Sequence, residues 1–531
     1  MGTVQITALI ALFLFAAIMV CIGVLSARKA KTLDGFLLGG RNVGPWMAAF
    51  SYGTAYFSAV IMIGYAGKFG WDIGLGSIWI GIGNAVLGCL LAWLLLAKRT
   101  RAMTHNLGSR TMPEFFSSRF GDKKMKVYAA VIIFIFLVPY ASGVYNGLGS
   151  MFGAIFPGLS IFGLDSGTVC MFIVALLTSV YLVLGGYTAS SRTDFVQGIV
   201  MIVSVVLMVL GLVFSPQVGG PVAAIEKLSS VEGGQLTDIF GGKNFGFLCV
   251  NILLTSFGVW GMPQMVSKFY AIKSHTLVKT GTIVSTGFAI IIGCGAYFAG
   301  TLGRFFTSDF TAATPVDAGV SGGYDGVVPN MLMQAFSGSV WGSILLSLVL
   351  LCVLSASMST LSAIVLSSAS AISVDLAGVF RKNLQQKSQI KWTRILCFVF
   401  IALSFFLATA KISIIVTLMS FSWGVVAGCF IGPFIWGLWW KKTTKAGVWC
   451  GLIGGLATVV FLTGYSMLSS PELSESVFAA FKAASADAPL FGVTAMAVSV
   501  IIVPLVSLFT TKLPEPLVAS AFNPDDGLSE K

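Results

Sequence analysis

The sequence predicts an all-α polytopic membrane protein that crosses the bilayer about thirteen times. Of its 531 residues, 56% are hydrophobic and only 10% are charged, and the mean hydropathy is +0.92. A soluble chain of this length carries charge on about a quarter of its residues. The apolar stretches run for about 20 residues each, which is enough for a helix to cross a bilayer core about 30 Å thick. The alternating ten-residue pattern of a membrane β-barrel is absent.

Thirteen apolar stretches follow one another along the chain. Their approximate ranges are 4–26, 45–67, 74–97, 127–156, 163–185, 191–214, 244–267, 278–303, 338–376, 392–410, 412–439, 445–469 and 488–511. The first stretch lacks a basic leader and a convincing cleavage site, so we expect a retained helix. Loops between the stretches are too short to hold a separate soluble domain, so residues 1–531 form one membrane domain.

Lysine and arginine indicate the direction of the chain. With the N-terminus outside, 26 of the 32 Lys and Arg residues fall in cytoplasmic segments, as the positive-inside rule requires. The six residues left on the outer side are Lys68, Lys227, Lys243, Arg304, Lys411 and Lys482. We therefore expect a multi-pass protein with an outside N-terminus and a cytoplasmic C-terminus. The net charge of +12 comes from basic residues in the short loops between the apolar stretches, where membrane topology requires them, and it does not indicate a nucleic-acid partner.

Cysteine and histidine form no pattern typical of a metal site or an enzyme. The nine cysteines lie in apolar stretches without a CxxC pair, which is typical of small buried hydrophobic residues. His105 and His275, the two histidines, lie in predicted inner loops without metal-ligand spacing. No nucleophile motif accompanies them. We therefore expect neither an enzyme nor a bound cofactor.

Two of the predicted helices contain residues that interrupt a helix. The stretch 45–67 has the sequence Gly-Thr-Ala-Tyr-Phe-Ser at 53–58, and the stretch 244–267 has Gly-Val-Trp-Gly-Met-Pro at 258–263. Pro263 lacks a backbone donor. Glycine and proline also serve simple close packing in membrane helices. However, the two stretches are second and seventh in order, which is the spacing of two inverted five-helix repeats with broken helices at the binding site.

The ninth stretch, 338–376, is unusually rich in hydroxyl groups. Ser355, Ser359 and Ser362 lie on one face of the predicted helix, with Thr360 beside them. A single such hydroxyl commonly bonds the carbonyl one turn back. Several together, near the free carbonyls of a broken helix, form a set of hard oxygen ligands suited to a small alkali cation.

Few acidic residues fall inside the predicted helices. Asp194 follows Arg192 at the cytoplasmic start of the sixth stretch, and acids within a membrane are costly and usually functional. The alternative is that Asp194 caps the helix N-terminus. Asp375 is expected in the inner interface. No lysine or arginine is expected at mid-membrane depth, so a carboxylate solute would rely on helix ends, hydroxyls or a bound cation.

The sequence resembles the sodium/solute symporter family, and most closely its proline and pantothenate carrier subgroups. The resemblance covers nearly the whole chain, and five segments in the family's order carry it. They are Gly39–Pro45, Gly185–Gly198, Gly261–Gln264, Met358–Ser362 and Gly424–Phe434, the last leading into Trp439–Gly447.

The resemblance implies a leucine-transporter-like fold built of two inverted five-helix repeats. An extra helix at 4–26 would precede the repeats 45–214 and 244–439, and two helices within 445–511 would follow them. It also implies sodium-coupled import of a small organic solute (an amino acid, a pantothenate-like compound or a monocarboxylate) by alternating access in a bacterial plasma membrane. One alternative is a proton-coupled carrier on the same fold, against which the serine-threonine cage argues. The other is a channel, which is less favoured because the sequence shows no pore helix or filter repeat. No obligate protein partner is expected.

The resemblance further implies which residues bind sodium and solute. The expected sodium ligands are the carbonyls of Thr54, Phe57 and Ala356 and the hydroxyls of Ser359 and Thr360. Asp194 matches the family's acid of sodium release or of a second sodium site. The expected solute pocket consists of Tyr56, Ser58, Tyr140, Thr255, Ser256, Trp260, Phe421 and Ser422. Tyr56 stands where proline carriers have an aspartate, and Thr255 and Val259 stand where they have aromatics, so proline itself is not the expected solute.

Overall fold

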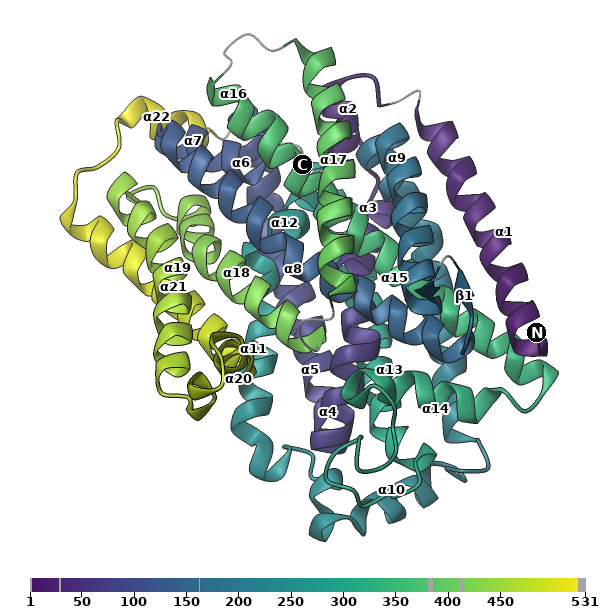
Figure 1. The fold of residues 1–531 in the computed structure, drawn as a ribbon. Coiled ribbons are helices and arrows are strands. Elements are labelled where there is room, and N and C mark those ends of the chain that lie inside the picture. Colours follow the sequence, from purple (N-terminus) through teal and green to yellow (C-terminus); the bar gives the residue numbers. More distant parts are fainter. Residues whose placement is uncertain (1, 28–29, 162, 381–384, 411–414, 524–531) are drawn as a thin grey trace.

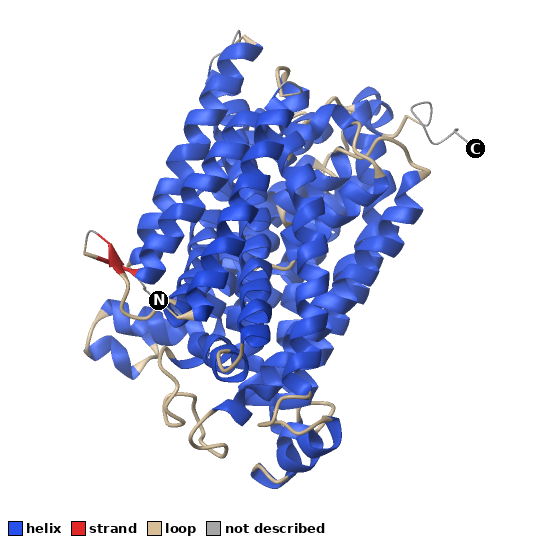
Figure 2. Cartoon of the chain, turned by 90° about the vertical axis from the view of Figure 1, so that its right-hand side faces the viewer, coloured by secondary structure: helices blue, strands red, loops and turns tan. Residues whose placement is uncertain are grey.

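The computed structural model describes residues 2–27, 30–161, 163–380, 385–410 and 415–523. Long helices run side by side between two ends of the molecule, and short helices and loops cover these ends (Figures 1 and 2). The long helices are α1 (Thr3–Ser26), α8 (Lys123–Ile155), α9 (Ser166–Val213), α11 (Phe245–Gly261), α13 (Leu277–Thr301), α15 (Val340–Ser370), α17 (Gln386–Thr409), α18 (Ile415–Trp439), α19 (Lys445–Leu468) and α21 (Ala488–Phe509).

Shorter elements interrupt and connect these helices. The short α-helices are α2 (Leu33–Leu38), α3 (Pro45–Tyr56), α4 (Ala66–Ile73), α5 (Ile78–Gly83), α6 (Lys98–Asn106), α7 (Met112–Phe120), α10 (Pro221–Ser229), α12 (Pro263–Tyr270), α14 (Val327–Phe336), α16 (Ala377–Phe380), α20 (Val477–Ala484) and α22 (Glu515–Ala521). Wider, π-helical segments span Val60–Tyr65, Asn84–Leu91, Trp93–Ala97 and Ala371–Leu376. Tighter 3-10 turns span Gly39–Arg41, Gly74–Ser77, Glu232–Thr237, Gly242–Asn244, Leu302–Phe306, Gly323–Gly326, Pro471–Ser474 and Ser485–Asp487. Strands β1 (Ser160–Ile161) and β2 (Leu164–Asp165) pair antiparallel.

Within the described residues, eleven helical stretches are long and apolar enough to cross a membrane. The stretch Ser166–Val213 has 48 residues. A straight helix of that length would extend about 70 Å, more than twice the thickness of a bilayer core. It covers the two predicted stretches 163–185 and 191–214. The exact number of thirteen crossings stays a prediction, and the start of the predicted stretch 412–439, with Lys411, lies outside the described residues.

A glycine bends α9 where the two predicted stretches meet. Gly186 has φ 53° and ψ −143°, and a Cβ there would lie 2.4 Å from the carbonyl oxygen of Phe36. Only glycine adopts this backbone conformation without strain, and only glycine fits against the neighbouring chain. The C-terminal part of α9, which carries Asp194, therefore turns against α3.

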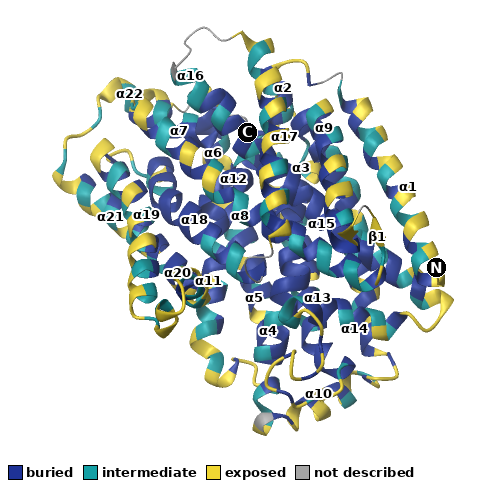
Figure 3. Ribbon diagram, in the orientation of Figure 1, coloured by how far each residue is buried: buried dark blue, intermediate teal, exposed yellow. Residues whose placement is uncertain are grey.

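The core of the molecule is built around α15 and α18, which are mostly buried. The outer helices α1, α19 and α21 expose their outward faces (Figure 3). Phe13, Phe461 and Phe509 are among the exposed side chains there. Large apolar residues exposed in this way indicate a surface that faces lipid rather than water.

Basic helices gather at one end of the bundle. In Figure 1, α6, α7, α16 and α22 lie at the upper end, whereas α1 begins at the lower end, where α10, α14 and α20 also lie. Arg99 and Arg101 belong to α6, and Arg119 to α7, whereas Lys227 and Lys482, two of the predicted outer residues, belong to α10 and α20. This grouping agrees with the predicted direction of the chain, in which the upper end is cytoplasmic.

Candidate cation and solute site

The second predicted helix is broken at its centre. The first half, α3, ends at Tyr56 because Phe57 adopts an extended conformation, with φ −95° and ψ 96°. Helical structure resumes at Val60, whose N–H donates to the Ser58 hydroxyl at 3.2 Å. The Ser58 carbonyl then accepts from Ile61 N. The break therefore leaves backbone groups near Phe57 outside any helical ladder, as the polar run at 53–58 predicts.

The seventh predicted helix is broken in the same way. Helix α11 ends at Gly261, Met262 is extended with φ −82° and ψ 121°, and α12 begins with Pro263 as its first residue. Proline suits this position because it supplies a helical φ and needs no donor there. The second half-helix carries Gln264 and Lys268, which lie one turn apart and are both buried.

Helix α15 brings its hydroxyl groups against the end of α3. Ser359 Oγ donates to Thr54 Oγ1 at 2.7 Å, and Thr360 Oγ1 donates to the Ala55 carbonyl at 3.1 Å and the Thr54 carbonyl at 3.4 Å. Ser362 Oγ contacts Ser190 Oγ of α9 at 2.8 Å. All of these hydroxyls are fully buried or nearly so. Hydroxyl and carbonyl oxygens of three helices thus lie close together here, and a cation bound among them stays a prediction.

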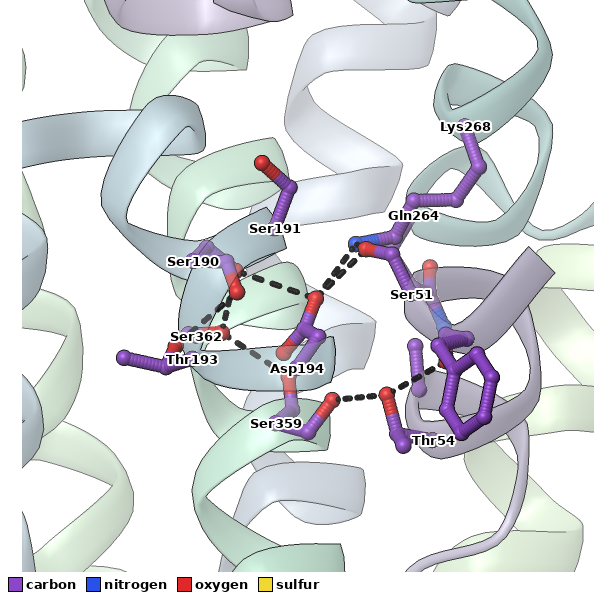
Figure 4. Close-up of polar contacts among 12 residues, drawn as sticks. Ser51, Thr54, Ser190, Ser191, Thr193, Asp194, Gln264, Lys268, Ser359 and Ser362 are labelled. Carbon is purple, nitrogen blue, oxygen red and sulfur yellow. Dashed lines mark hydrogen bonds and ion pairs between the residues drawn. The ribbon is translucent and has the colours of Figure 1, made fainter. Parts of the chain in front are cut away.

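Asp194 joins this cluster from α9 (Figure 4). Its side chain is fully buried, and its Oδ2 accepts from the Ser51 hydroxyl of α3 and lies 3.5 Å from Ser190 Oγ. Within the described residues, Oδ1 has no hydrogen-bond partner. Because the carboxylate reaches another helix from the interior of α9, Asp194 is not an N-terminal cap, which was the alternative reading of the sequence.

Lys268 also belongs to this buried cluster, which the sequence alone does not predict. Its Nζ donates to Ser51 Oγ at 2.8 Å, lies 3.5 Å from Asp194 Oδ2 and lies 5.1 Å from the centre of the Tyr187 ring. The residue is 1% exposed. The sequence predicts Lys268 in a cytoplasmic segment, whereas the structure buries it, because the break before Pro263 turns α12 inward.

Of the eight predicted solute residues, Ser58 lies in the break after α3, where its hydroxyl accepts from Val60 N–H, and the other seven fall into two groups. In the first, the Tyr56 ring stacks on Trp423 with centroids 6.3 Å apart, and the Tyr140 ring meets Trp423 edge-on at 5.8 Å. Tyr56 also donates its hydroxyl to the Thr255 carbonyl at 2.7 Å. The hydroxyls of Thr255 and Ser256 both donate to Asn84 Oδ1, at 2.8 and 3.2 Å. Asn84 and Trp423, which the sequence did not single out, therefore belong to the same buried cluster.

The second group makes packing contacts elsewhere. Trp260 donates its Nε1 to the Leu87 carbonyl at 3.0 Å. Ser422 donates to the Phe136 carbonyl, and the Phe421 ring lies against Phe136 at 6.1 Å. A role for Trp260, Phe421 and Ser422 in binding solute stays a prediction.

Asp375, which the sequence predicts in the inner interface, is enclosed by other parts of the protein. It is fully buried, and its Oδ1 accepts from Thr111 at 2.8 Å and lies 3.3 Å from Lys126 Nζ. Lys126 also pairs with Glu114 at 3.3 Å. The helix α7, which contains Glu114, folds over the end of α15 and covers the carboxylate, and this tertiary contact leaves no mark in the local sequence.

A model of the sodium:solute symporter family matches residues 36–455. The chain belongs to this family. It is 29% identical over 478 residues to the osmoregulated proline transporter OpuE of Bacillus subtilis, covering 89% of this chain and 92% of that protein. It is 30% identical over 448 residues to the sodium/proline symporter of Haemophilus influenzae, covering 83% and 85% of the two chains. The sodium/proline symporter of Escherichia coli is 29% identical, with 86% and 87% covered.

The fold matches that of a transporter of known structure. The structure of a sodium-coupled sialic acid symporter superimposes with a TM-score of 0.72, covering 96% of this chain and 99% of that one at 16% sequence identity. The leucine-transporter-like fold implied by the sequence is thereby confirmed. As a member of the sodium:solute symporter family, the chain is a multi-pass membrane transporter, not an enzyme, and couples sodium to a small organic solute.

Proposed function

We propose that this symporter imports a small solute that carries a carboxylate (an amino acid, a pantothenate-like compound or a monocarboxylate) together with sodium and without any cofactor. The proposed sodium ligands are the carbonyls of Thr54, Phe57 and Ala356 and the hydroxyls of Ser359 and Thr360. The contact that carries this proposal is the 2.7 Å bond from Ser359 to Thr54, with Thr360 against the adjacent carbonyls.

The chemistry of these groups fits sodium better than a divalent ion. Neutral hydroxyl and carbonyl oxygens are hard ligands, and they suit a monovalent cation that needs no strong charge compensation. Sodium bound there would tie the broken α3 to α15. It can bias alternating access only as far as it binds one conformation more tightly than the other. At a membrane potential of 100 mV, one inward charge adds about 2.3 kcal/mol of driving force.

The buried cluster of Tyr56, Asn84, Tyr140 and Trp423 beside the broken helix would offer donors for a carboxylate. Asn84 Nδ2 and Trp423 Nε1 are buried and have no hydrogen-bond partner among the described residues. Buried donors of this kind are costly unless a ligand satisfies them. The rings of Tyr56 and Tyr140 would pack on the apolar part of the solute. The proline carriers among the relatives make an amino acid the first candidate, whereas Tyr56 at the position of their aspartate argues against proline.

A stability screen on the purified protein tests this proposal. Amino acids, pantothenate and short monocarboxylates are each added in sodium chloride and in potassium chloride, and the melting temperature is recorded. A ligand that stabilises the protein only in sodium identifies the solute, because a ligand that binds the native state raises its stability. Identical melting temperatures in the two salts for every ligand that binds would contradict the proposed sodium site.

The proposal includes a location and a direction. The protein would reside in the plasma membrane with its N-terminus outside and its C-terminus in the cytoplasm. The basic helices α6 and α7 at one end of the bundle support this direction.

A further inference from the structure

The ion pair between Lys268 and Asp194 lies in the interior of the symporter. The two side chains are 2% and 0% exposed, and their charged atoms lie 3.5 Å apart. Ser51 Oγ lies between them, accepting from Lys268 and donating to Asp194. Three helices are joined here, since Lys268 belongs to α12, Asp194 to α9 and Ser51 to α3 (Figure 4).

The other groups in contact with this pair are neutral. Ser190 bonds the carboxylate, and the Tyr187 ring lies beside the ammonium. A buried charge is tolerated when an opposite charge compensates it, and here each member compensates the other. The ion pair as a whole therefore carries no net charge, and the negative charge of Asp194 is not available to a second cation.

The pair lies directly beside the proposed sodium ligands. Ser359, whose hydroxyl bonds Thr54, also offers its carbonyl to Ser362, and Ser362 contacts Ser190 next to Asp194. A sodium ion drawn to Asp194 would stand a few ångströms from the ammonium of Lys268. Two like charges about 4 Å apart, at an effective dielectric constant of about 20, disfavour joint occupancy by about a thousandfold.

We propose that Lys268 serves as a resident counter-ion that occupies the place of a second sodium ion at Asp194, so that the symporter couples one sodium ion to each solute. This inference rests on the proposed sodium site at Thr54, Ser359 and Thr360. It makes Lys268 the residue that sets the ion stoichiometry. A variant without this ammonium leaves the buried carboxylate uncompensated and recruits a second sodium ion.

Sodium itself is the probe in the test. The purified protein is unfolded thermally at pH 8 in increasing sodium chloride, with choline chloride holding the ionic strength constant. The dependence of stability on the logarithm of sodium concentration counts the ions bound to the native state. The variants are Lys268→Met and Lys268→Gln, with Lys268→Arg as a control that keeps the charge and Lys268→Met combined with Asp194→Asn as a neutral pair.

The expected slopes correspond to one ion for the wild type, Lys268→Arg and the double variant, and to two ions for Lys268→Met and Lys268→Gln. A slope of two for the wild type overturns the proposal, even if no variant can be purified. A slope of one for a folded Lys268→Met or Lys268→Gln protein overturns it as well, while leaving the first sodium site intact. A wild type that does not respond to sodium instead overturns the proposed sodium site on which the inference rests.

Discussion

Ser359 is the residue whose single hydroxyl most directly joins the two halves of the proposed sodium site. Replacing Ser359 by alanine removes one ligand oxygen and its 2.7 Å bond to Thr54. A lost bond to a charged group costs about 1.5–3 kcal/mol. We therefore expect the sodium concentration for half-maximal stabilisation to rise by about ten- to a hundredfold in the Ser359→Ala protein, measured by sodium titration of the melting temperature.

The same helix offers a matched control. Ser357 is equally buried, but its hydroxyl donates to the Val353 carbonyl one turn back at 2.7 Å. The Ser357→Ala protein should keep the wild-type sodium response, since this bond lies within α15 itself. Equal losses in the two variants would assign the effect to the packing of α15 and would contradict a ligand role for Ser359.

Asn84 holds the hydroxyls of Thr255 and Ser256 and leaves its own N–H groups for solute. We expect Asn84→Leu to weaken solute binding at saturating sodium by about tenfold or more while the sodium response without solute stays unchanged. The solute found in the stability screen is titrated against both proteins. A parallel loss of the sodium response would show that Asn84 supports the fold rather than the solute.

At the residue scale, the sequence predicts some of these groups and not others. The hydroxyls of Ser359 and Thr360 stand out because so many polar residues in one apolar stretch need an explanation. Lys268 is not predicted, because a lysine just beyond an apolar stretch usually lies in water and only the inward turn of α12 buries it. Asn84 is a single polar residue in an apolar stretch, and its contacts depend on α11, which is distant in the sequence.

Among the elements, the bend in α9 makes the sharpest prediction. Gly186→Ala should lower the stability by about 1–3 kcal/mol, because its positive φ and the 2.4 Å approach to Phe36 leave no room for a methyl group. Gly287→Ala in α13, where a Cβ meets nothing within 4 Å, should be neutral or stabilise the helix slightly. Melting temperatures of both proteins decide the matter. Similar losses would contradict a special role for the bend.

The outer turn Gly323–Gly326 is expected to respond to pH. Asp325 Oδ2 accepts from the Ile415 N–H at the start of α18, and Tyr324 donates its hydroxyl to Asp72 of α4 at 2.9 Å. Burial raises the pKa of the Asp325 carboxyl to about 6, although the Ile415 N–H and Lys68 lower it. The carboxyl therefore binds a proton more tightly when the turn is packed against α18 than when the turn is detached. The packed state becomes more stable as the pH falls from about 6 to about 4, and it gains nothing further below that.

Hydrogen exchange in this turn measures the effect. Between pH 8 and pH 5, the expected gain is about 1.4 kcal/mol, or about tenfold in protection after correction for intrinsic exchange rates. The Asp325→Asn protein, which cannot ionise at this position, should show no such change. A pH response that persists in Asp325→Asn would assign it to another group.

The sequence predicts both breaks of α3 and α11 because glycine, proline and polar residues interrupt apolar stretches there. It does not predict the π-helical segments Val60–Tyr65 and Asn84–Leu91. Such a segment inserts an extra residue into a helical turn and is stabilised by neighbouring packing rather than by local preference. The position of Asn84 relative to α11 depends on this inserted residue. The hydrophobic pattern of the sequence therefore could not place Asn84 beside Thr255 and Ser256.

For the whole molecule, the asymmetry of charge makes a prediction that does not depend on the site. Helix α13 separates Ser274, in a predicted inner loop, from Gly319, in a predicted outer loop. Alkaline phosphatase, which is active only after export, should be active when fused after Gly319 and inactive when fused after Ser274. The reason is that the segment before α13 carries Lys273, which the positive-inside rule retains in the cytoplasm. The opposite pattern would mean that the protein is inserted in the opposite orientation. The sodium gradient would then act on the opposite face of the protein. Equal activity at both positions would instead mean that α13 does not cross the membrane, which would contradict the paired repeats on which the broken helices and the proposed site depend.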